Sequence, residues 1–476
     1  MTDNTPGSIA QSYEDTAEML IQNQGRVMNR ETVPNVVFEI GPDMLGKNTI
    51  LEERHAPRVI QFLQDKCCRV GCVPLALAFY NGCLLTPDFV NCLLEGPEMS
   101  KMCRESIEHL VIHGGTIPDG DAGKIVLTTL LYPFTSSDGN NLVGADFSGL
   151  VFSQGQGSIL HMIAQALHPG RRKGSQKMFK ALFMHNCGIC DSKARDIAAE
   201  IISPNYQSLE TLCLLRNNIT PGGAKIVGGV LEKCFNLRRI EIEVHGKTNE
   251  GAIVDLGDEE DADQADGYPI LKAMSTIAAL RKRWNLPQIL DRLILKNTQV
   301  NLKAMKVLGD VIESSVLTYL DVSGSSMSND TVSLLLQSIH QGQNVKLIHL
   351  DLSDIELSGK NVKLLTKLFD GDTLVKLHTN YCEMTNSSFH RILNKAQEAP
   401  TMKELHCKGN KITWEGMALL LQPSHKFMNL EILDLSENCY GGTSKENLSE
   451  IMKKYPSVKI GYEDGVSSSD ASTTSD

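Results

Sequence analysis

The sequence has no long hydrophobic run, few aromatic residues and no excess of positive charge. Its apolar stretches fall short of the 18 or more residues that a membrane-spanning helix needs, so we expect no membrane span. Aromatic residues make up only 5% of the 476 residues, and the formal net charge is −11. Because binding to a nucleic-acid backbone relies on clustered Lys and Arg, this charge argues against a nucleic-acid partner.

A secretion signal is also missing from the given sequence. Its first residues, MTDNTPGSIAQSYEDTAEML, have neither the basic start nor the apolar core of such a signal. We therefore expect a cytoplasmic protein, with the nucleus as the alternative, whose 13 cysteines are reduced thiols. The hydrophobic fraction of 41% and the charged fraction of 22% are those of a folded protein, which excludes wholesale disorder.

The motifs of common enzymes are absent as well. The sequence contains no G-x-x-x-x-G-K-[ST], H-E-x-x-H or G-x-S-x-G pattern. The nearest approach to a phosphate-binding loop, Gly123-Lys124-Ile125, lacks the first glycine and the final hydroxyl of that motif. We therefore expect a non-enzymatic protein without catalytic residues and without a cofactor.

What the sequence does contain is an internal repeat. The clearest copy starts at Leu209, has apolar residues at its first, fourth and sixth positions, and has Asn217 at its ninth. Its second part places Gly223, Val227 and Leu231 at spacings of four. Further copies follow at intervals of 27 to 30 residues and start at Leu290, Leu317, Leu347, Leu374, Met402, Leu430 and Val458, and another candidate starts at Leu237. Such regular intervals indicate a solenoid of stacked units.

Each unit is predicted to contain one strand and one helix. The alternating Leu-x-x-Leu-x-Leu part is typical of a strand, and the following four-residue spacing, as in Ile412, Gly416 and Leu420, is typical of a helix. Strands stack about 4.8 Å apart, whereas packed helices need roughly 8–10 Å, so the helical side must fan out. We expect an α/β solenoid in the form of a curved horseshoe, with parallel strands on its concave face and helices on its convex face.

These units resemble the leucine-rich repeats of the ribonuclease-inhibitor type, which are about 28 residues long and carry Asn or Cys at the ninth position. Five units match at that position, with Asn217, Asn410, Asn438, Cys187 and Cys382. Three other units carry Thr298, Ser325 and Ile355 there, which leaves their turn geometry open.

Cys187 and Cys190 have the spacing of a zinc or redox pair. The repeat already explains Cys187 as an inward ninth-position residue, and no second pair follows at zinc-ribbon spacing. We therefore expect neither a metal site nor a redox site at these cysteines.

The repeat also sets the expected domain boundaries. Units starting at Phe179, Leu142, Ile107 and Pro74 extend the solenoid over residues 71–460. Residues 1–70 are expected to hold an N-terminal segment, partly disordered at its start, and a helical cap, because stacked repeats need terminal units that close the core. Residues 57–66 have helical spacing and are expected to belong either to this cap or to the first unit. Residues 461–476, rich in Ser, Thr and Asp, are too polar to fold.

Two insertions are predicted to form loops on opposite rims of the solenoid, since one follows a helix and the other follows a strand. The basic loop spans residues 168–177 and the acidic insertion lies near residues 244–268. Each loop is either solvated or a contact for a partner of opposite charge. Their charged residues of interest are Arg171, Arg172, Lys173, Asp258, Glu259, Glu260 and Asp261.

The third and fifth positions of five successive units predict a polar, largely acidic strip on the concave face. These positions alternate with the inward leucines and therefore point away from the core. We call the following nine residues the concave strip: Tyr319, Asp321, His349, Asp351, Lys376, His378, Glu404, His406 and Asp434. The strip is either exposed and polar for solubility alone, or a recognition surface. A metal site at His378 and His406 is not expected, because flat sheet ladders seldom bring enough ligands onto one ion.

The resemblance implies a binding protein. We expect an intracellular adaptor, scaffold or regulatory subunit that binds one or more proteins, with a basic or mixed-charge face, through the concave strip and the rim loops. The alternatives are a GTPase-activating protein similar to the activator of the nuclear-transport GTPase, a structural subunit of a larger cytoskeletal or axonemal assembly, and a microbial effector. In the GTPase activators an acidic segment follows the repeats, whereas here GDEEDADQAD interrupts them. The oligomeric state stays open.

Overall fold

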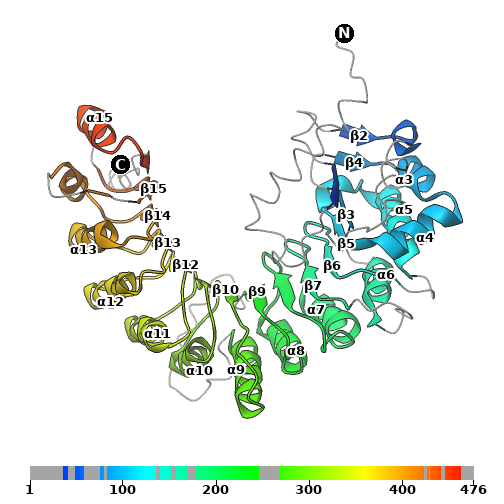
Figure 1. Ribbon diagram of the computed structural model, residues 1–476, viewed down its shortest axis with the longest axis horizontal. Coiled ribbons are helices and arrows are strands. Elements are labelled where there is room, and N and C mark those ends of the chain that lie inside the picture. Colours follow the sequence, from blue (N-terminus) through cyan, green and yellow to red (C-terminus); the bar gives the residue numbers. More distant parts are fainter. Residues whose placement is uncertain are drawn as a thin grey trace, which may run out of the picture. The chain divides into compact units, whose positions relative to one another are not determined.

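The chain forms two compact units, and in each of them parallel strands alternate with helices (Figure 1). The first unit comprises residues 1–219 and 233–237, and the second comprises residues 220–232 and 238–476. The computed structural model describes residues 36–40, 49–57, 60, 75–79, 83–135, 140–151, 157–169, 178–245, 267–422, 426–427, 429–440 and 445–462.

In the first unit, neighbouring strands of the main sheet pair in parallel, in the order β1-β3-β5-β6-β7-β8. These strands are β1 (Val36–Ile40), β3 (Leu75–Phe79), β5 (Ile107–Ile112), β6 (Gly144–Asp146), β7 (Ala181–Phe183) and β8 (Thr211–Leu214). A separate parallel pair consists of β2 (Thr49–Leu51) and β4 (Cys83–Leu85). The helices are η3 (Glu53–His55), α3 (Pro87–Leu94), α4 (Pro97–Ser106), η4 (Gly114–Thr116), α5 (Gly120–Leu131), η5 (Tyr132–Thr135), α6 (Gly157–Leu167), α7 (Asp191–Ile197) and the π-helical η7 (Ala198–Ile202).

In the second unit, the strands follow the chain order from β9 to β16, and all of them pair in parallel. They are β9 (Arg239–Glu243), β10 (Arg292–Lys296), β11 (Tyr319–Asp321), β12 (His349–Asp351), β13 (Lys376–His378), β14 (Glu404–His406), β15 (Ile432–Asp434) and β16 (Lys459–Gly461). The helices are α8 (Pro221–Leu231), α9 (Tyr268–Arg283), α10 (Leu302–Glu313), α11 (Asn329–Gln341), α12 (Gly359–Leu365), η9 (Thr366–Gly371), α13 (Asn386–Glu398), α14 (Trp414–Ala418), η10 (Leu419–Leu421) and α15 (Lys445–Lys454).

The repeat pattern explains both kinds of element. In the eight units predicted to start between Leu209 and Leu430, the strand begins two residues after the start. The leucine-type positions form the core; Leu317, Leu320 and Val322, for instance, are fully buried. Polar residues begin the helices, as where the Ser328 hydroxyl accepts the Thr331 backbone N–H at the start of α11. The α/β leucine-rich-repeat solenoid predicted from the sequence is thereby confirmed in each unit.

The ninth-position asparagines hold successive turns together. The Asn410 Oδ1 atom accepts the backbone N–H groups of Cys382 and Met384, both at 3.0 Å. Its Nδ2 atom donates to the carbonyls of Thr379 and Cys407 at 2.8 and 2.9 Å. One buried side chain thus bonds to four backbone groups that belong to two adjacent units, and it supplements the backbone hydrogen bonds between their turns. Asn217 and Asn438 form equivalent sets of bonds.

Units with other residues at the ninth position make only some of these hydrogen bonds to the turn. The Ser325 hydroxyl donates to the Leu295 carbonyl at 3.1 Å and lies 3.1 Å from the Thr298 hydroxyl. Ile355 is buried and brings no polar group to its turn. The Cys187 thiol donates to the Phe147 carbonyl at 3.2 Å, and burial raises its pKa to about 12, so it is a neutral turn residue as the repeat predicted.

Two boundary expectations change. Strand β1 lies within residues 1–70, where a helical cap was expected, so the sheet begins earlier than the sequence suggested. The last unit starts at Ser457 and not at Val458, because Ile460 pairs with Leu433, a fourth-position residue. Most of the helical segment expected at residues 57–66 and most of the polar end 461–476 lie outside the described residues. Within the part of the chain that the structure covers, no helix is both long and apolar enough to cross a membrane.

Candidate functional site

The structure brings all nine residues of the concave strip together on strands β11–β15. The parallel register sets the third positions in one row, Tyr319, His349, Lys376 and Glu404, and the fifth positions in a second row, Asp321, Asp351, His378, His406 and Asp434. Residues that are 27 to 30 positions apart in the sequence are therefore direct neighbours on adjacent strands.

The three aspartates of the second row have a structural task that the sequence analysis did not assign. Each accepts, through Oδ1, the backbone N–H two residues further on, in Ser323, Ser353 and Ser436, at 2.9–3.0 Å. These are Asx turns, which close the end of each strand. The recurring Asp-x-Ser sequence was the available signal. Asp321 is only 2% exposed and Asp351 only 9%, so these two carboxylates are buried although their positions alternate with those of the core leucines.

The second carboxylate oxygen of each aspartate faces a basic group. The Oδ2 atom of Asp321 lies 2.8 Å from Lys296 Nζ, and that of Asp351 lies 3.3 Å from His378 Nδ1. Burial opposes ionisation of Asp351, but hydrogen bonds from His378 and Ser353 outweigh it and lower the pKa of Asp351 to about 2. Burial and the nearby Asp351 carboxylate raise the pKa of Asp321. The strip is thus an internally paired array of charges.

The sequence analysis missed the basic end of this surface, on β9 and β10. One carboxylate oxygen of Glu241 lies 2.6 Å from the Arg239 guanidinium and 2.6 Å from that of Arg292. The Arg292 guanidinium also lies 3.6 Å from the centre of the Tyr319 ring, a cation–π contact. The units starting at Leu237 and Leu290 carry these side chains at the same positions as the strip, so the repeat could have revealed them. The surface therefore has mixed charge.

Two ion pairs on this face remain open to solvent. Lys376 Nζ lies 2.7 Å from Glu404 Oε1, with 42% and 20% of the two side chains exposed. In the turns after the strands, Lys408 Nζ lies 2.7 Å from Glu437 Oε1, and the Tyr381 hydroxyl donates to Glu437 Oε2. We call Tyr381, Lys408 and Glu437 the turn edge. Tyr381 is 44% exposed, so it offers an accessible aromatic ring.

Four rings lie in a continuous row along the strip, and only the first two are stacked face to face. Tyr319 and His349 are parallel with centroids 4.1 Å apart, and the His349–His378 and His378–His406 distances are 4.7 and 4.3 Å. Burial, reinforced by the neighbouring His378, lowers the pKa of His349 to about 3. The same causes, in the same order, lower the pKa of His406. His349 and His406 are therefore neutral imidazoles near pH 7, whose unprotonated nitrogens can act as ligands.

Potential metal ligands converge at two places in this row of rings. One ligand atom from each of His349, Asp351 and His378 lies within 4.8 Å of the others, and the same holds for His378, Glu404 and His406. The sequence analysis did not expect such convergence on a flat ladder. The imidazoles lean toward one another across adjacent strands, and this tilt depends on side-chain rotamers that the sequence does not reveal.

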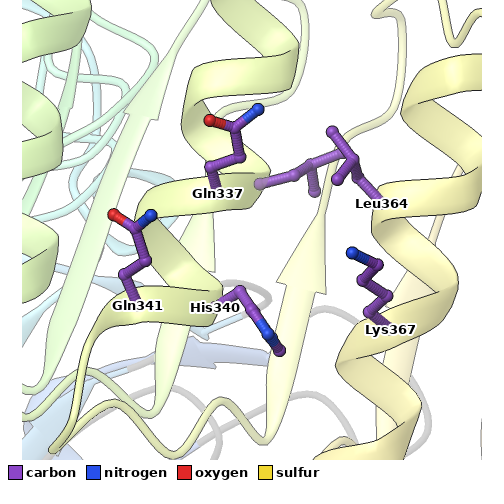
Figure 2. Close-up of a pocket in the computed structure, with 6 residues that line it drawn as sticks. Gln337, His340, Gln341, Leu364 and Lys367 are labelled. Atoms are coloured by element: carbon purple, nitrogen blue, oxygen red, sulfur yellow. The ribbon is translucent and has the colours of Figure 1, made fainter.

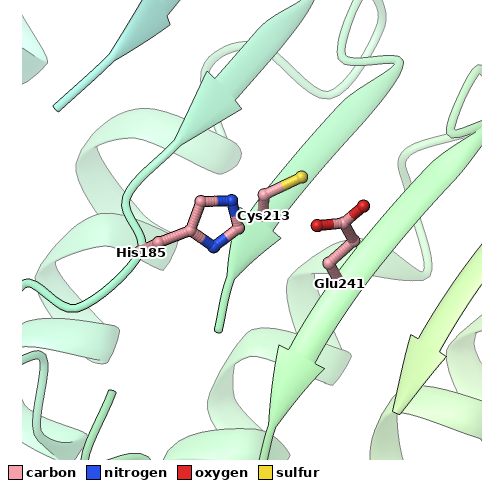
Figure 3. A group of neighbouring side chains, drawn as sticks. All are labelled: His185, Cys213 and Glu241. Carbon is pink, nitrogen blue, oxygen red and sulfur yellow. The ribbon is translucent and has the colours of Figure 1, made fainter. Parts of the chain in front are cut away.

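A third group is drawn in Figure 3, which shows His185 after β7, Cys213 on β8 and Glu241 on β9. His185 Nδ1 accepts the Leu215 backbone N–H at 3.3 Å, so this ring also supports a turn. His185 and Cys213 belong to the first unit, whereas Glu241 belongs to the second and is bound by two arginines there. We assign no metal site to this group.

A pocket of about 270 Å³ opens between α11 and α12 (Figure 2). Its lining consists of Leu336, Gln337, His340, Gln341, Leu364 and Lys367. Ligand pockets usually measure roughly 300–1,000 Å³, so this hollow is small for a substrate. The predicted rim-loop residues, Arg171, Arg172, Lys173, Asp258, Glu259, Glu260 and Asp261, lie outside the described residues.

Comparisons with known proteins leave the family open. No family model matches the chain, and no curated protein matches it. Solved structures that match include TLR13 in the TLR13–ssRNA13 complex, with a TM-score of 0.38, 12% identity, and coverage of 88% of this chain and 58% of that chain. A protein from Bacteroides fragilis matches with a TM-score of 0.28 and 14% identity over 61% of this chain and 67% of its own. The chain thus spans less than two thirds of the TLR13 chain. The assignment as a leucine-rich-repeat solenoid rests on the parallel ladder, the repeat and the ninth-position hydrogen bonds.

Proposed function

We propose that this protein is a non-enzymatic binding solenoid whose concave strip and turn edge bind a protein with a mixed-charge face. The observation that carries the proposal is the ordered row of charged and aromatic side chains on strands β11–β15. Concave surfaces of stacked repeats are extended and suit the binding of a large partner.

The contacts divide the surface into supporting and accessible residues. Asp321 and Asp351 are buried and close turns, so they stabilise the backbone of this surface and are not expected to contact a partner. Lys376, Glu404, Lys408, Glu437 and Tyr381 are accessible enough to meet a partner. Hydrogen bonds and ion pairs hold these side chains in place before binding, which reduces the entropy lost on association.

Charge complementarity gives such a surface its specificity. Both signs of charge are present on it, so a partner with the matching pattern gains contacts, whereas a mismatched partner meets like charges that cost several kcal/mol. An exposed tyrosine beside a charged pair is a typical anchor at protein interfaces. We propose an adaptor, scaffold or regulatory role inside the cell, in line with the thiols of Cys187 and Cys382, which are buried and donate to backbone carbonyls.

The test exchanges the members of an ion pair. The double variants Lys376→Glu/Glu404→Lys and Lys408→Glu/Glu437→Lys each keep an ion pair but invert the charge pattern seen by a partner. We expect each exchange to weaken capture of the same partner from native lysate by at least about tenfold, because like charges then face each other across the interface. Binding is measured by quantitative pull-down against the wild-type protein.

The matched control is Lys395→Glu/Glu398→Lys on α13. The two side chains lie 3.2 Å apart and belong to the same repeat region, but they are on a helix. We expect it to retain the partner, while circular dichroism confirms that all variants are folded. If both exchanges on the concave face retain the partner at wild-type level, the proposal is wrong.

A further inference from the structure

We propose that His378, Glu404 and His406 bind one divalent transition-metal ion, such as Zn²⁺, on the concave face. The proposal goes beyond protein binding, since it assigns a site for an inorganic ligand. Two imidazoles and one carboxylate are a common ligand set for such ions, which leaves a further position for water or for a group from a partner.

The sheet register brings the three ligands together. His378 on β13 pairs with His406 on β14, and Lys376 on β13 pairs with Glu404 on β14. One ligand atom from each of the three side chains lies within 4.8 Å of the others. Backbone pairing fixes the positions of all three Cα atoms, so the site sits on rigid strands and needs only small side-chain rotations to close around an ion.

The two histidines have nitrogens without a hydrogen-bond partner. The Nε2 atoms of both His378 and His406 are buried and make no hydrogen bond. Buried polar atoms in native proteins are nearly always paired, so an orphaned pair at one place calls for an explanation. A metal ion would accept both lone pairs at once.

Carboxylates on the far side of each ring complete the arrangement. His378 Nδ1 lies 3.3 Å from Asp351 Oδ2, and His406 Nδ1 lies 3.6 Å from Asp434 Oδ2. Metal-binding histidines usually direct their second nitrogen to a carboxylate in this way, which sets the tautomer and strengthens the ligand. The aspartates that close the strand turns would therefore also orient the ligands.

Glu404 is also held in position by a neighbouring side chain. Its Oε1 atom is bound by Lys376 at 2.7 Å, while its Oε2 atom faces His406 Nε2 at 3.7 Å. The lysine thus holds one oxygen and leaves the other directed at the site.

The neighbouring group of His349, Asp351 and His378 is less suitable. Both oxygens of Asp351 are already engaged, Oδ1 by the Ser353 N–H and Oδ2 by His378. Because Oδ1 closes the turn, an ion there would have to displace the His378 contact from Oδ2. We therefore assign the ion to His378, Glu404 and His406, with His349 outside the ligand set.

The test is a direct titration of the purified full-length protein after chelator treatment. Co²⁺ is added first, because its absorption spectrum reports coordination by nitrogen, and Zn²⁺ is then used as competitor. We expect one ion per chain. His378→Ala and His406→Ala should each weaken binding at least about 100-fold, and Asp434→Asn, which disturbs only the orienting carboxylate, about 10–100-fold.

Two controls replace histidines outside the proposed ligand set. His349→Phe retains the ring stack and should bind Co²⁺ like the wild type, as should His340→Ala on α11. Circular dichroism confirms folding of each variant. Equal affinity of the wild type and the His378 and His406 variants, or loss with His349→Phe alone, would overturn the assignment, as would the absence of binding. The titration needs no partner, and the Lys408–Glu437 exchange leaves the ligands intact, so this proposal and the proposed function fail independently.

Discussion

At the scale of single residues, His349 makes stability depend on pH. Its pKa is about 3 in the folded protein and about 6.5 in an unfolded chain, so the unfolded state binds more protons between these values. The contribution of His349 is fully present above pH 6.5 and is lost as the pH falls toward 3. At pH 5 the loss should be about 2 kcal/mol relative to pH 7.

His349→Phe should remove this part of the pH dependence, because phenylalanine keeps the ring on Tyr319 without titrating. The measurement is chemical denaturation at pH 7 and pH 5 with chelator present. His340→Gln, on the exposed end of α11, is the matched control and should change stability with pH as the wild type does. An unaltered pH dependence in His349→Phe would show that the ring is not buried as neutral imidazole.

At the scale of elements, the ninth-position asparagine joins neighbouring strands and turns. Asn410→Ala would leave the N–H groups of Cys382 and Met384 and the Thr379 carbonyl without this partner, whereas the Cys407 carbonyl would keep its bond from Asn438. Each unsatisfied buried group costs about 1–3 kcal/mol, partly relieved by entering water. We expect the free energy of unfolding of the second unit to fall by about 3–5 kcal/mol in urea denaturation.

The control for this substitution is Asn394→Ala on α13. Its side chain is exposed and bonds only to the His390 and Gln397 side chains, so the change should stay within about 0.5 kcal/mol. Equal effects of the two substitutions would mean that water replaces the Asn410 bonds at no cost.

At the scale of the whole molecule, the division into two compact units predicts separate stabilities. Repeat proteins are stabilised by contacts between neighbouring repeats. A destabilising substitution therefore affects only the repeats that unfold cooperatively with the substituted one. Asn410→Ala should therefore increase hydrogen exchange in β13–β15 and leave protection in β5–β7 unchanged. Hydrogen-exchange mass spectrometry resolves both regions. Equal loss of protection in both would show that the chain unfolds as one cooperative body.

The sequence predicted which residues form the concave strip, but not their burial or their contacts. The third and fifth positions of the repeat identified all nine strip residues, because strand alternation decides which side chains share a face. The same positions in the units from Leu237 and Leu290 would have added Arg239, Glu241 and Arg292. The use of Asp321 and Asp351 as turn caps was readable in the Asp-x-Ser pattern. The burial of Asp321 and Asp351 could not be read from the sequence, because it depends on their contacts with Lys296 and His378.

From the sequence alone follow the solenoid, the starts of strands β8 to β15 and the composition of the concave strip. These follow from periodicity, which acts within one unit and decides what each residue must bury. Only the tertiary structure decided the division into two units, the pairing of charges and the convergence of His378, Glu404 and His406. Those features join side chains some 28 residues apart, and their distances depend on strand spacing and rotamers that no local pattern encodes.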